Sequence, residues 1–81
     1  FGKEEYKNDK INIEFHTPVN GDVAINLYSS NGELLQNNTF TEVKYGTYQT
    51  QIDVSKYQSG VYFIEVQTPM GRFTKKIIIV R

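Results

Sequence analysis

The amino-acid sequence predicts an all-β domain, and three observations carry that prediction. Apolar and polar residues alternate in several short runs, which is the period-two pattern of half-buried strands. No window of about eleven residues shows the spacing of an amphipathic helix, and β-branched and aromatic residues dominate the patterned runs. Six or seven such runs, about 8 to 12 residues apart, favour an immunoglobulin-like antiparallel β-sandwich, with a small β-barrel as the alternative.

The first part of the chain contains a charged segment followed by two predicted strands. Residues 1–10 are irregular and are expected to form a connector that could add a short edge strand, leaving residues 11–81 as the sandwich. Residues 11–16 alternate as a strand that ends before Pro18, because proline lacks the backbone donor that continues pairing. A turn then leads into a second strand over residues 23–28, which we expect to run back on the first.

The middle of the chain carries the sharpest turn signal and the weakest strand. Asn31-Gly32 is predicted to form a tight primed hairpin turn, since this pair tolerates the positive φ that such a turn needs. The strand that follows, residues 33–40, is rich in Asn and Gln and is expected at a sheet edge, or to slip out of the sheet midway. After a bend at residues 43–46, residues 48–54 alternate again as a further strand.

The strongest strand signal is residues 60–66, which follow a polar turn ending in Gly60. Tyr62 is expected on the core side, and Gly60 is expected to hold a backbone conformation closed to other residues. This strand is predicted to lie at the centre of its sheet. The last strand, residues 72–80, becomes apolar on both faces from Ile77 onward, which suits burial on both sides or a bulge that switches faces.

Charge and composition exclude several classes of function. Nine basic and nine acidic residues cancel, so the chain lacks the basic field that draws nucleic acid or anionic membranes. The longest apolar run, residues 77–80, is far shorter than the roughly 20 residues that span a bilayer. With no cysteine and a single histidine, His16 on an outward strand position, the chain offers neither a zinc ligand set nor a nucleophile with its base. We therefore expect no enzyme, no metal and no cofactor, and no motif supports a calcium site of loop oxygens.

Aromatic residues are numerous, with six tyrosines and five phenylalanines. Phe15 and Tyr62 are predicted in the core because they lie in register with aliphatic neighbours. Four others are candidates for exposure that could stack on sugar rings or line a groove for a partner: Tyr28, Tyr45, Tyr57 and Phe63. A carbohydrate-binding sandwich is therefore one alternative function, and a passive accessory sandwich of a multidomain surface protein is another.

Three stretches, in this order along the chain, resemble a known family. They are residues 29–35 (SSNGELL), 59–66 (SGVYFIEV) and 73–81 (FTKKIIIVR). The family that they resemble is the type A C-terminal sorting domain of type IX secretion substrates. Its domains carry a short turn before a hydrophobic pair, a Ser-Gly-x-Tyr turn into a central strand, and a final strand that is basic and then aliphatic. The resemblance covers about residues 11–81.

The resemblance implies a non-catalytic, immunoglobulin-like sandwich at the C-terminal end of a larger secreted protein. It implies recognition by the outer-membrane translocon, removal by a sortase-like cysteine protease, and attachment of the cargo to a surface lipopolysaccharide. Carried over by position, the residues of the structural motif are Gly32, Ser59, Gly60 and Tyr62, and those implied in recognition are Lys75, Lys76 and Arg81.

Two further expectations concern the ends of the chain. Because the sequence begins with Phe1 rather than Met, we expect a piece excised from a longer polypeptide, with a processed mature form as the alternative. An exposed last strand could offer main-chain groups and basic side chains to a receptor by strand addition. Lys75 and Lys76 could instead be gatekeeper charges that keep a sticky strand from pairing with other chains.

Overall fold

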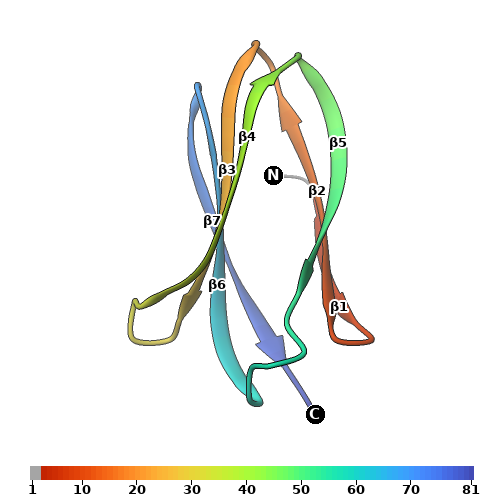
Figure 1. Ribbon diagram of the computed structural model, residues 1–81, viewed down its shortest axis with the longest axis vertical. Coiled ribbons are helices and arrows are strands. Elements are labelled where there is room, and N and C mark those ends of the chain that lie inside the picture. The colour runs from red at the N-terminus through yellow and green to blue at the C-terminus, as the bar shows by residue number, and fades with distance from the viewer. Residues whose placement is uncertain (1–2) are drawn as a thin grey trace.

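The computed structural model describes residues 3–81, which form seven β-strands and no helix (Figure 1). Their bounds are β1 (Lys3–Lys7), β2 (Lys10–Thr17), β3 (Gly21–Ser29), β4 (Leu34–Val43), β5 (Gly46–Asp53), β6 (Gly60–Thr68) and β7 (Gly71–Ile79). Phe1 and Gly2, at the start of the predicted connector, lie outside the described residues. The remainder of that segment contains β1, which lies at the edge of a sheet.

The strands form two antiparallel sheets that face each other (Figure 1). The smaller sheet has the order β1-β2-β5, and the larger sheet has the order β4-β3-β6-β7. The two sheets do not close into a barrel, so the predicted sandwich is confirmed and the barrel alternative is wrong. β6 lies inside the larger sheet, as its alternation predicts, and β4 lies at an edge and shifts register twice against β3.

The pairing expected between the first two predicted strands is wrong. β2 pairs with β1 and β5, whereas β3 pairs with β4 and β6 in the other sheet. Pro18 follows β2 directly and cannot donate to a ladder, and the Thr17 hydroxyl donates to the carbonyl of Val19 at 2.8 Å. The connection between β2 and β3 therefore crosses the roughly 10 Å between stacked sheets instead of closing a hairpin.

The core lies between the two sheets and is built from the inward-facing residues of five strands, β2, β3, β5, β6 and β7, and from the loop after β5. Its members are aliphatic apart from Phe15, whose ring stacks on Tyr48 with the centroids 5.6 Å apart. The buried residues are Ile11, Ile13, Phe15, Val23, Ile25, Leu27, Ile52, Val54, Ile64, Val66, Ile77 and Ile79. The alternation read from the sequence thus places the core correctly.

The turn at Asn31-Gly32 has a different geometry from the one predicted. Gly32 has φ 89° and donates its N–H to the carbonyl of Ser29 at 3.0 Å, while Asn31 does not have positive φ. The Ser29 hydroxyl also accepts a hydrogen bond from the N–H of Glu33 at 3.1 Å. These bonds favour a longer turn that ends in a left-handed glycine over a two-residue primed turn.

A primed turn occurs instead at Asn8-Asp9, between β1 and β2. Asn8 has φ 54° and Asp9 has φ 63°, and the flanking residues Lys7 and Lys10 are directly paired. Asn and Asp are the non-glycine residues that adopt this conformation most readily. The Asn-Asp pair was therefore the sequence signal for a hairpin inside the predicted connector.

Neither expectation for the last strand is correct. β7 pairs with β6 in regular register from Gly71 to Ile79, without a bulge. Ile77 and Ile79 face the core, whereas Ile78 is 55% exposed. Because β7 is an edge strand whose outer face has no further layer over it, this face stays open to solvent. The apolar run therefore lies partly at the surface.

Candidate functional site

The Ser-Gly-x-Tyr motif forms the corner at which the chain enters β6. Gly60 has φ 158°, a backbone conformation that residues with a side chain rarely adopt. The ring of Tyr62 is half-buried against the core, and its hydroxyl donates to the carbonyl of Gln58 at 2.7 Å. This back-bonded tyrosine at the start of a strand is the tyrosine corner of immunoglobulin-like sandwiches. The motif therefore fixes the fold locally.

A similar glycine and aromatic arrangement recurs at two other strand starts. The Tyr48 hydroxyl donates to the carbonyl of Lys44 at 2.6 Å, and its ring lies against Gly46. Phe73 lies against Gly71 in the same way but has no hydroxyl. Sequence analysis missed this repeat, whose signal is a glycine followed two residues later by an aromatic.

The three basic residues assigned to recognition are not brought together. Lys75 lies opposite Ile64 on the inner face of β7, and its ammonium is 3.3 Å from the Glu4 carboxylate on β1. Lys76 lies opposite Phe63 on the outer face. Consecutive residues of a strand point to opposite faces, so one partner surface cannot contact both lysines in the same way. The Lys75 contact instead links β7 to β1 across the edge of the sandwich.

Arg81 joins three distant parts of the chain. Its guanidinium donates to the Asp9 carboxylate in the first hairpin and to the carbonyls of Val54 and Tyr57 in the loop before β6. Its backbone N–H donates to the Ser59 hydroxyl at 2.9 Å. The side chain is only 27% exposed. These contacts clamp the end of the last strand to the corner that holds the Ser-Gly-x-Tyr motif.

Five apolar side chains gather on the outer face of the larger sheet, at the end nearest Arg81. Cross-strand pairing places Leu34, Tyr28 and Phe63 in one row and Val61 and Ile78 in the next. Leu34 is 51% exposed, and Val61 and Ile78 are also exposed. We call this surface the outer patch: Tyr28, Leu34, Val61, Phe63 and Ile78.

A buried polar network supports the outer patch from the adjoining row. Glu65 is only 8% exposed although it lies on the outer face, and it accepts hydrogen bonds from Asn26 at 2.9 Å and from the Tyr28 hydroxyl at 3.2 Å. Arg72 lies 3.8 Å from the same carboxylate, and Asn37 donates to Asn26 at 2.6 Å. Partial burial, followed by the negative charge of Glu65 and its hydrogen bond, raises the pKa of Tyr28. The network holds the Tyr28 ring in place.

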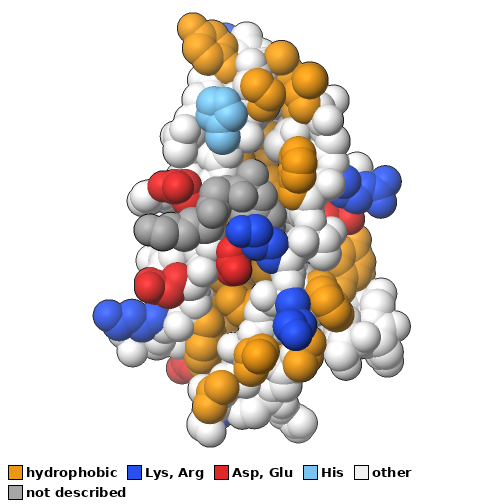
Figure 2. Space-filling view, turned by 180° about the vertical axis from the view of Figure 1, so that it is seen from behind, with side chains coloured by type: hydrophobic (Ala, Val, Ile, Leu, Met, Phe, Trp, Pro, Cys, Tyr) orange, Lys and Arg blue, Asp and Glu red, His pale blue; other side chains and the backbone are white. Residues whose placement is uncertain are grey.

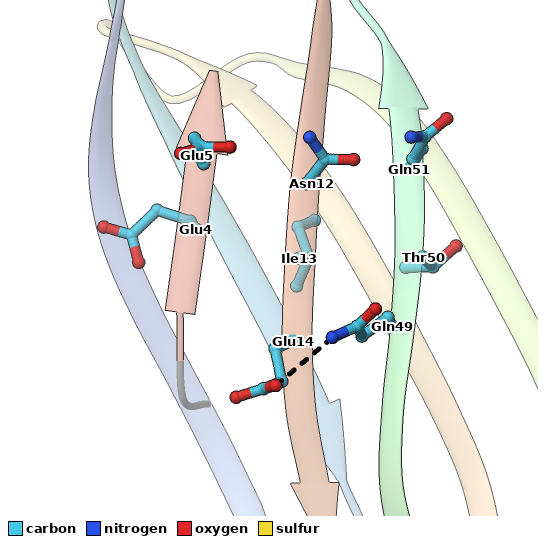
Figure 3. Close-up of a pocket in the computed structure, with 8 residues that line it drawn as sticks. All are labelled: Glu4, Glu5, Asn12, Ile13, Glu14, Gln49, Thr50 and Gln51. Carbon is cyan, nitrogen blue, oxygen red and sulfur yellow. Dashed lines mark hydrogen bonds between the residues drawn. The ribbon is translucent and has the colours of Figure 1, made fainter. Parts of the chain in front are cut away.

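The outer face of the smaller sheet is polar throughout its middle (Figure 3). Glu5, Asn12 and Gln51 lie side by side in one row, and Gln49 donates to Glu14 at 3.4 Å in another. These side chains line a shallow depression. We call this surface the polar face: Glu5, Asn12, Glu14, Gln49 and Gln51.

The one histidine of the chain, His16, lies on the outer face of the smaller sheet. His16 is exposed, as predicted, and its Nδ1 lies 3.3 Å from the Thr47 hydroxyl, and it forms no ion pair with a carboxylate within the described residues. The described chain holds no cluster of three or more His, Cys, Asp or Glu side chains that could bind a metal ion. Within the same residues no helix is long and apolar enough to cross a membrane.

The tyrosines proposed for a sugar platform differ in exposure. Tyr45 is 71% exposed in the loop between β4 and β5. Tyr57 packs against the core, and its hydroxyl lies within 3.4 Å of the Leu35 carbonyl, so its predicted exposure is wrong. The two residues lie in loops at opposite ends of the sandwich (Figure 1). They therefore do not form a common stacking platform.

From behind, hydrophobic side chains show along the middle of the molecule, with charged side chains among and beside them (Figure 2). At one edge of the sandwich, β1 and β7 contact each other through the Lys75–Glu4 ion pair. Partial exposure of apolar side chains at a sandwich edge needs no functional explanation, because two open edges leave some core atoms uncovered.

Comparison with known proteins finds one family match. The model of the family described as the secretion system C-terminal sorting domain matches residues 7–80, which is nearly the whole chain. No curated protein and no solved structure matches the chain.

Proposed function

The chain belongs to the secretion system C-terminal sorting domain family, and from this we propose that it directs a larger cargo protein through the type IX outer-membrane translocon to the cell surface. The observation that carries the proposal is the extent of the match, residues 7–80. This range includes six complete strands and the corner at Gly60. The match thus supports a folded domain, and not a short linear tag, as the proposed sorting signal.

The proposed role is non-catalytic. A hydrolytic or transfer reaction needs a nucleophile or an ion with a base and an orienting group nearby. His16, the natural candidate for a base, is exposed and hydrogen-bonded only to Thr47 within the described chain. We propose that the domain acts as a ligand for other proteins. The partners that we propose are the translocon and a sortase-like protease, which removes the domain from its cargo after export.

Recognition is proposed to involve the last strand and its basic residues. Of these, Lys76 is positioned for direct contact, because it lies on the outer face of β7. Lys75 and Arg81 contribute by holding β7 against β1 and against the Gly60 corner. Loss of either contact would weaken receptor binding indirectly, because it would displace β7.

A reporter fusion tests the proposed function. A folded periplasmic reporter is joined to the N-terminal side of this domain and expressed in a cell with a type IX system. We expect the reporter at the cell surface or in the medium, and retention in the periplasm in an isogenic strain without the translocon. The reporter alone serves as the control. Periplasmic retention of the fusion in the competent strain would rule the proposal out.

A further inference from the structure

We infer that the outer patch docks a protein segment of the secretion machinery that presents a carboxylate flanked by apolar side chains. This inference rests on the proposed sorting function and adds the surface and the chemistry of its partner. Among the outward strand positions of the two rows that contain the patch, Lys76 is the charged residue. Three features lead to this partner: exposed apolar area, a rigid base and an unpaired cation.

The apolar side chains of the patch come from all four strands of the larger sheet, with Leu34, Val61 and Ile78 exposed and the other two partly exposed. Leu34 on β4, Tyr28 on β3 and Phe63 on β6 are paired side by side, and Ile78 on β7 pairs with Val61 on β6. None of the five contributes to the buried core. Contiguous apolar surface rimmed by polar groups is typical of protein interaction sites.

The patch has a fixed base. Glu65, beneath the Tyr28 hydroxyl, is buried and satisfied by Asn26, Tyr28 and Arg72. β6, which supplies Val61 and Phe63, lies inside the sheet and is paired on both sides. A surface held in this way loses little conformational entropy when a partner binds.

Lys76 gives the patch its charge preference. It pairs with Phe63 across the strands, and no ion pair involving it occurs within residues 3–81. Glu65, in the next row, is buried, already accepts two hydrogen bonds, and has its own cation, Arg72, at 3.8 Å. Covering the apolar patch would desolvate Lys76, so the partner must supply a carboxylate beside its own apolar side chains.

Two other occupants fit less well. A second copy of this chain that packed patch on patch would cover Lys76 of each copy with a surface whose rows hold no carboxylate. An anionic lipid surface is held by clusters of basic residues, whereas Lys76 is the single basic residue in the rows of this patch, and the net charge of the chain is zero. A protein segment with an acidic group is the occupant that the charge favours.

Photocrosslinking in the exporting cell identifies the occupant. A benzoylphenylalanine is placed at Ile78 in the reporter fusion and, as the matched control, at Gln51 on the polar face. We expect an adduct from Ile78 alone, and peptide mapping should locate it on a segment of the secretion machinery that contains Asp or Glu among apolar residues. An adduct with a second copy of this chain or with lipid, equal adducts from both positions, or no adduct from Ile78 would overturn the inference.

Charge variants test the acidic character of the partner. Lys76→Glu should lower the exported fraction at least about tenfold, because like charges across an interface cost more than the roughly 1.4 kcal/mol that corresponds to a factor of ten. Lys76→Arg should recover most of that loss. Gln51→Glu makes a negative charge on the polar face and should leave export unchanged, and resistance of each fusion to protease verifies folding. Export of the Lys76→Glu fusion at the wild-type level refutes the docking site but not the sorting function, whereas failure of the unsubstituted fusion refutes the sorting function.

Discussion

Both sheets of this sandwich bury apolar side chains on their inner faces, but their outer faces present different side chains to solvent. On the polar face, the outward positions of β2 and β5 hold Asn12, Glu14, Gln49 and Gln51. On the larger sheet, the equivalent positions at one end hold the apolar residues of the outer patch. Antiparallel sheets commonly keep one face apolar for the core and one polar for water. The smaller sheet follows that rule and the larger sheet breaks it.

The difference separates the residues that build the fold from those available to a partner. Inward residues of both sheets are buried and account for the core. The outer patch adds nothing to that core, yet it is supported by a buried carboxylate and lies beside the strand that ends the chain. Polar side chains are expected on the solvent-facing side of a folded sheet. The apolar side chains of the outer patch are not needed for the core, so folding does not account for them.

The largest effect on stability is expected from the clamp at the end of the larger sheet. Arg81→Ala removes hydrogen bonds from a cation to Asp9, Val54 and Tyr57 and should lower the free energy of unfolding by about 2–3 kcal/mol. Urea denaturation of the purified reporter fusion, followed through the domain's tyrosine signal, measures the change. Lys76→Ala, the matched basic residue on the outer face, should change stability by less than about 0.5 kcal/mol. Equal losses of unfolding free energy in the two variants would mean that the Arg81 contacts do not stabilise the fold.

A second comparison uses one asparagine from each outer face. Asn26→Ala removes a hydrogen bond donor from the buried Glu65 carboxylate and the acceptor of the Asn37 amide, and should cost about 1–3 kcal/mol of unfolding free energy. Asn12→Ala, on the polar face, should cost less than about 0.5 kcal/mol because water replaces its contacts. Urea denaturation of both variants under identical conditions gives the two values. If the costs are the same, the network does not support the outer patch.

A smaller loss of stability is expected at the tyrosine corner, which lies on neither outer face. Tyr62→Phe removes the hydrogen bond to the Gln58 carbonyl while keeping the ring, and should cost about 1 kcal/mol. Because the corner only holds the fold, export of the reporter should fall in proportion to the folded fraction. Thermal unfolding and export of the same fusion are measured together. A loss of export at unchanged stability would mean that Tyr62 itself is contacted.

The smallest effects are pH-dependent and report on the two faces separately. The pKa of Tyr28, a member of the outer patch, is raised in the folded state, so its contribution to stability is present below its unfolded pKa and is lost as pH rises through the folded pKa. The pKa of Asp53, at the edge of the smaller sheet, is lowered by hydrogen bonds from the Ser55 N–H and hydroxyl and by Lys10. Its contribution is present above its unfolded pKa and is lost as pH falls through the folded pKa.

Urea midpoints across the pH range test both signs. Tyr28→Phe should flatten the alkaline decline in stability, and Asp53→Asn should flatten the acid decline. Each variant should leave the opposite arm of the profile unchanged. The reverse assignment would contradict the placement of these two groups.

Much of the architecture follows from alternation that is visible in the sequence. Alternate apolar residues predict both a strand and its buried face, as at Ile11, Ile13 and Phe15 and at Ile64 and Val66. Alternation does not reveal which strands are neighbours, which is why β3 was expected beside β2 and is found in the other sheet.

The candidate site was less predictable than the fold. The Lys-Lys pair looked like one basic feature, but strand geometry sends Lys75 to Glu4 and Lys76 to the outer face. The contacts of Arg81 join residues far apart in the sequence, and the burial of Glu65 depends on neighbours from two other strands. Long-range contacts of this kind leave no local pattern.

The most direct test of the central claim compares one added carboxylate on each outer face. Val61→Asp lies in the outer patch, where Val61 pairs with Ile78, and Gln51→Asp lies on the polar face, where Gln51 pairs with Asn12. The exported fraction of the reporter should fall at least about tenfold for Val61→Asp, because a carboxylate would then face the partner's own carboxylate across apolar surface. It should stay near the wild-type level for Gln51→Asp. Equal export of the two folded fusions would contradict the claim that the secretion machinery binds the outer patch and not the polar face.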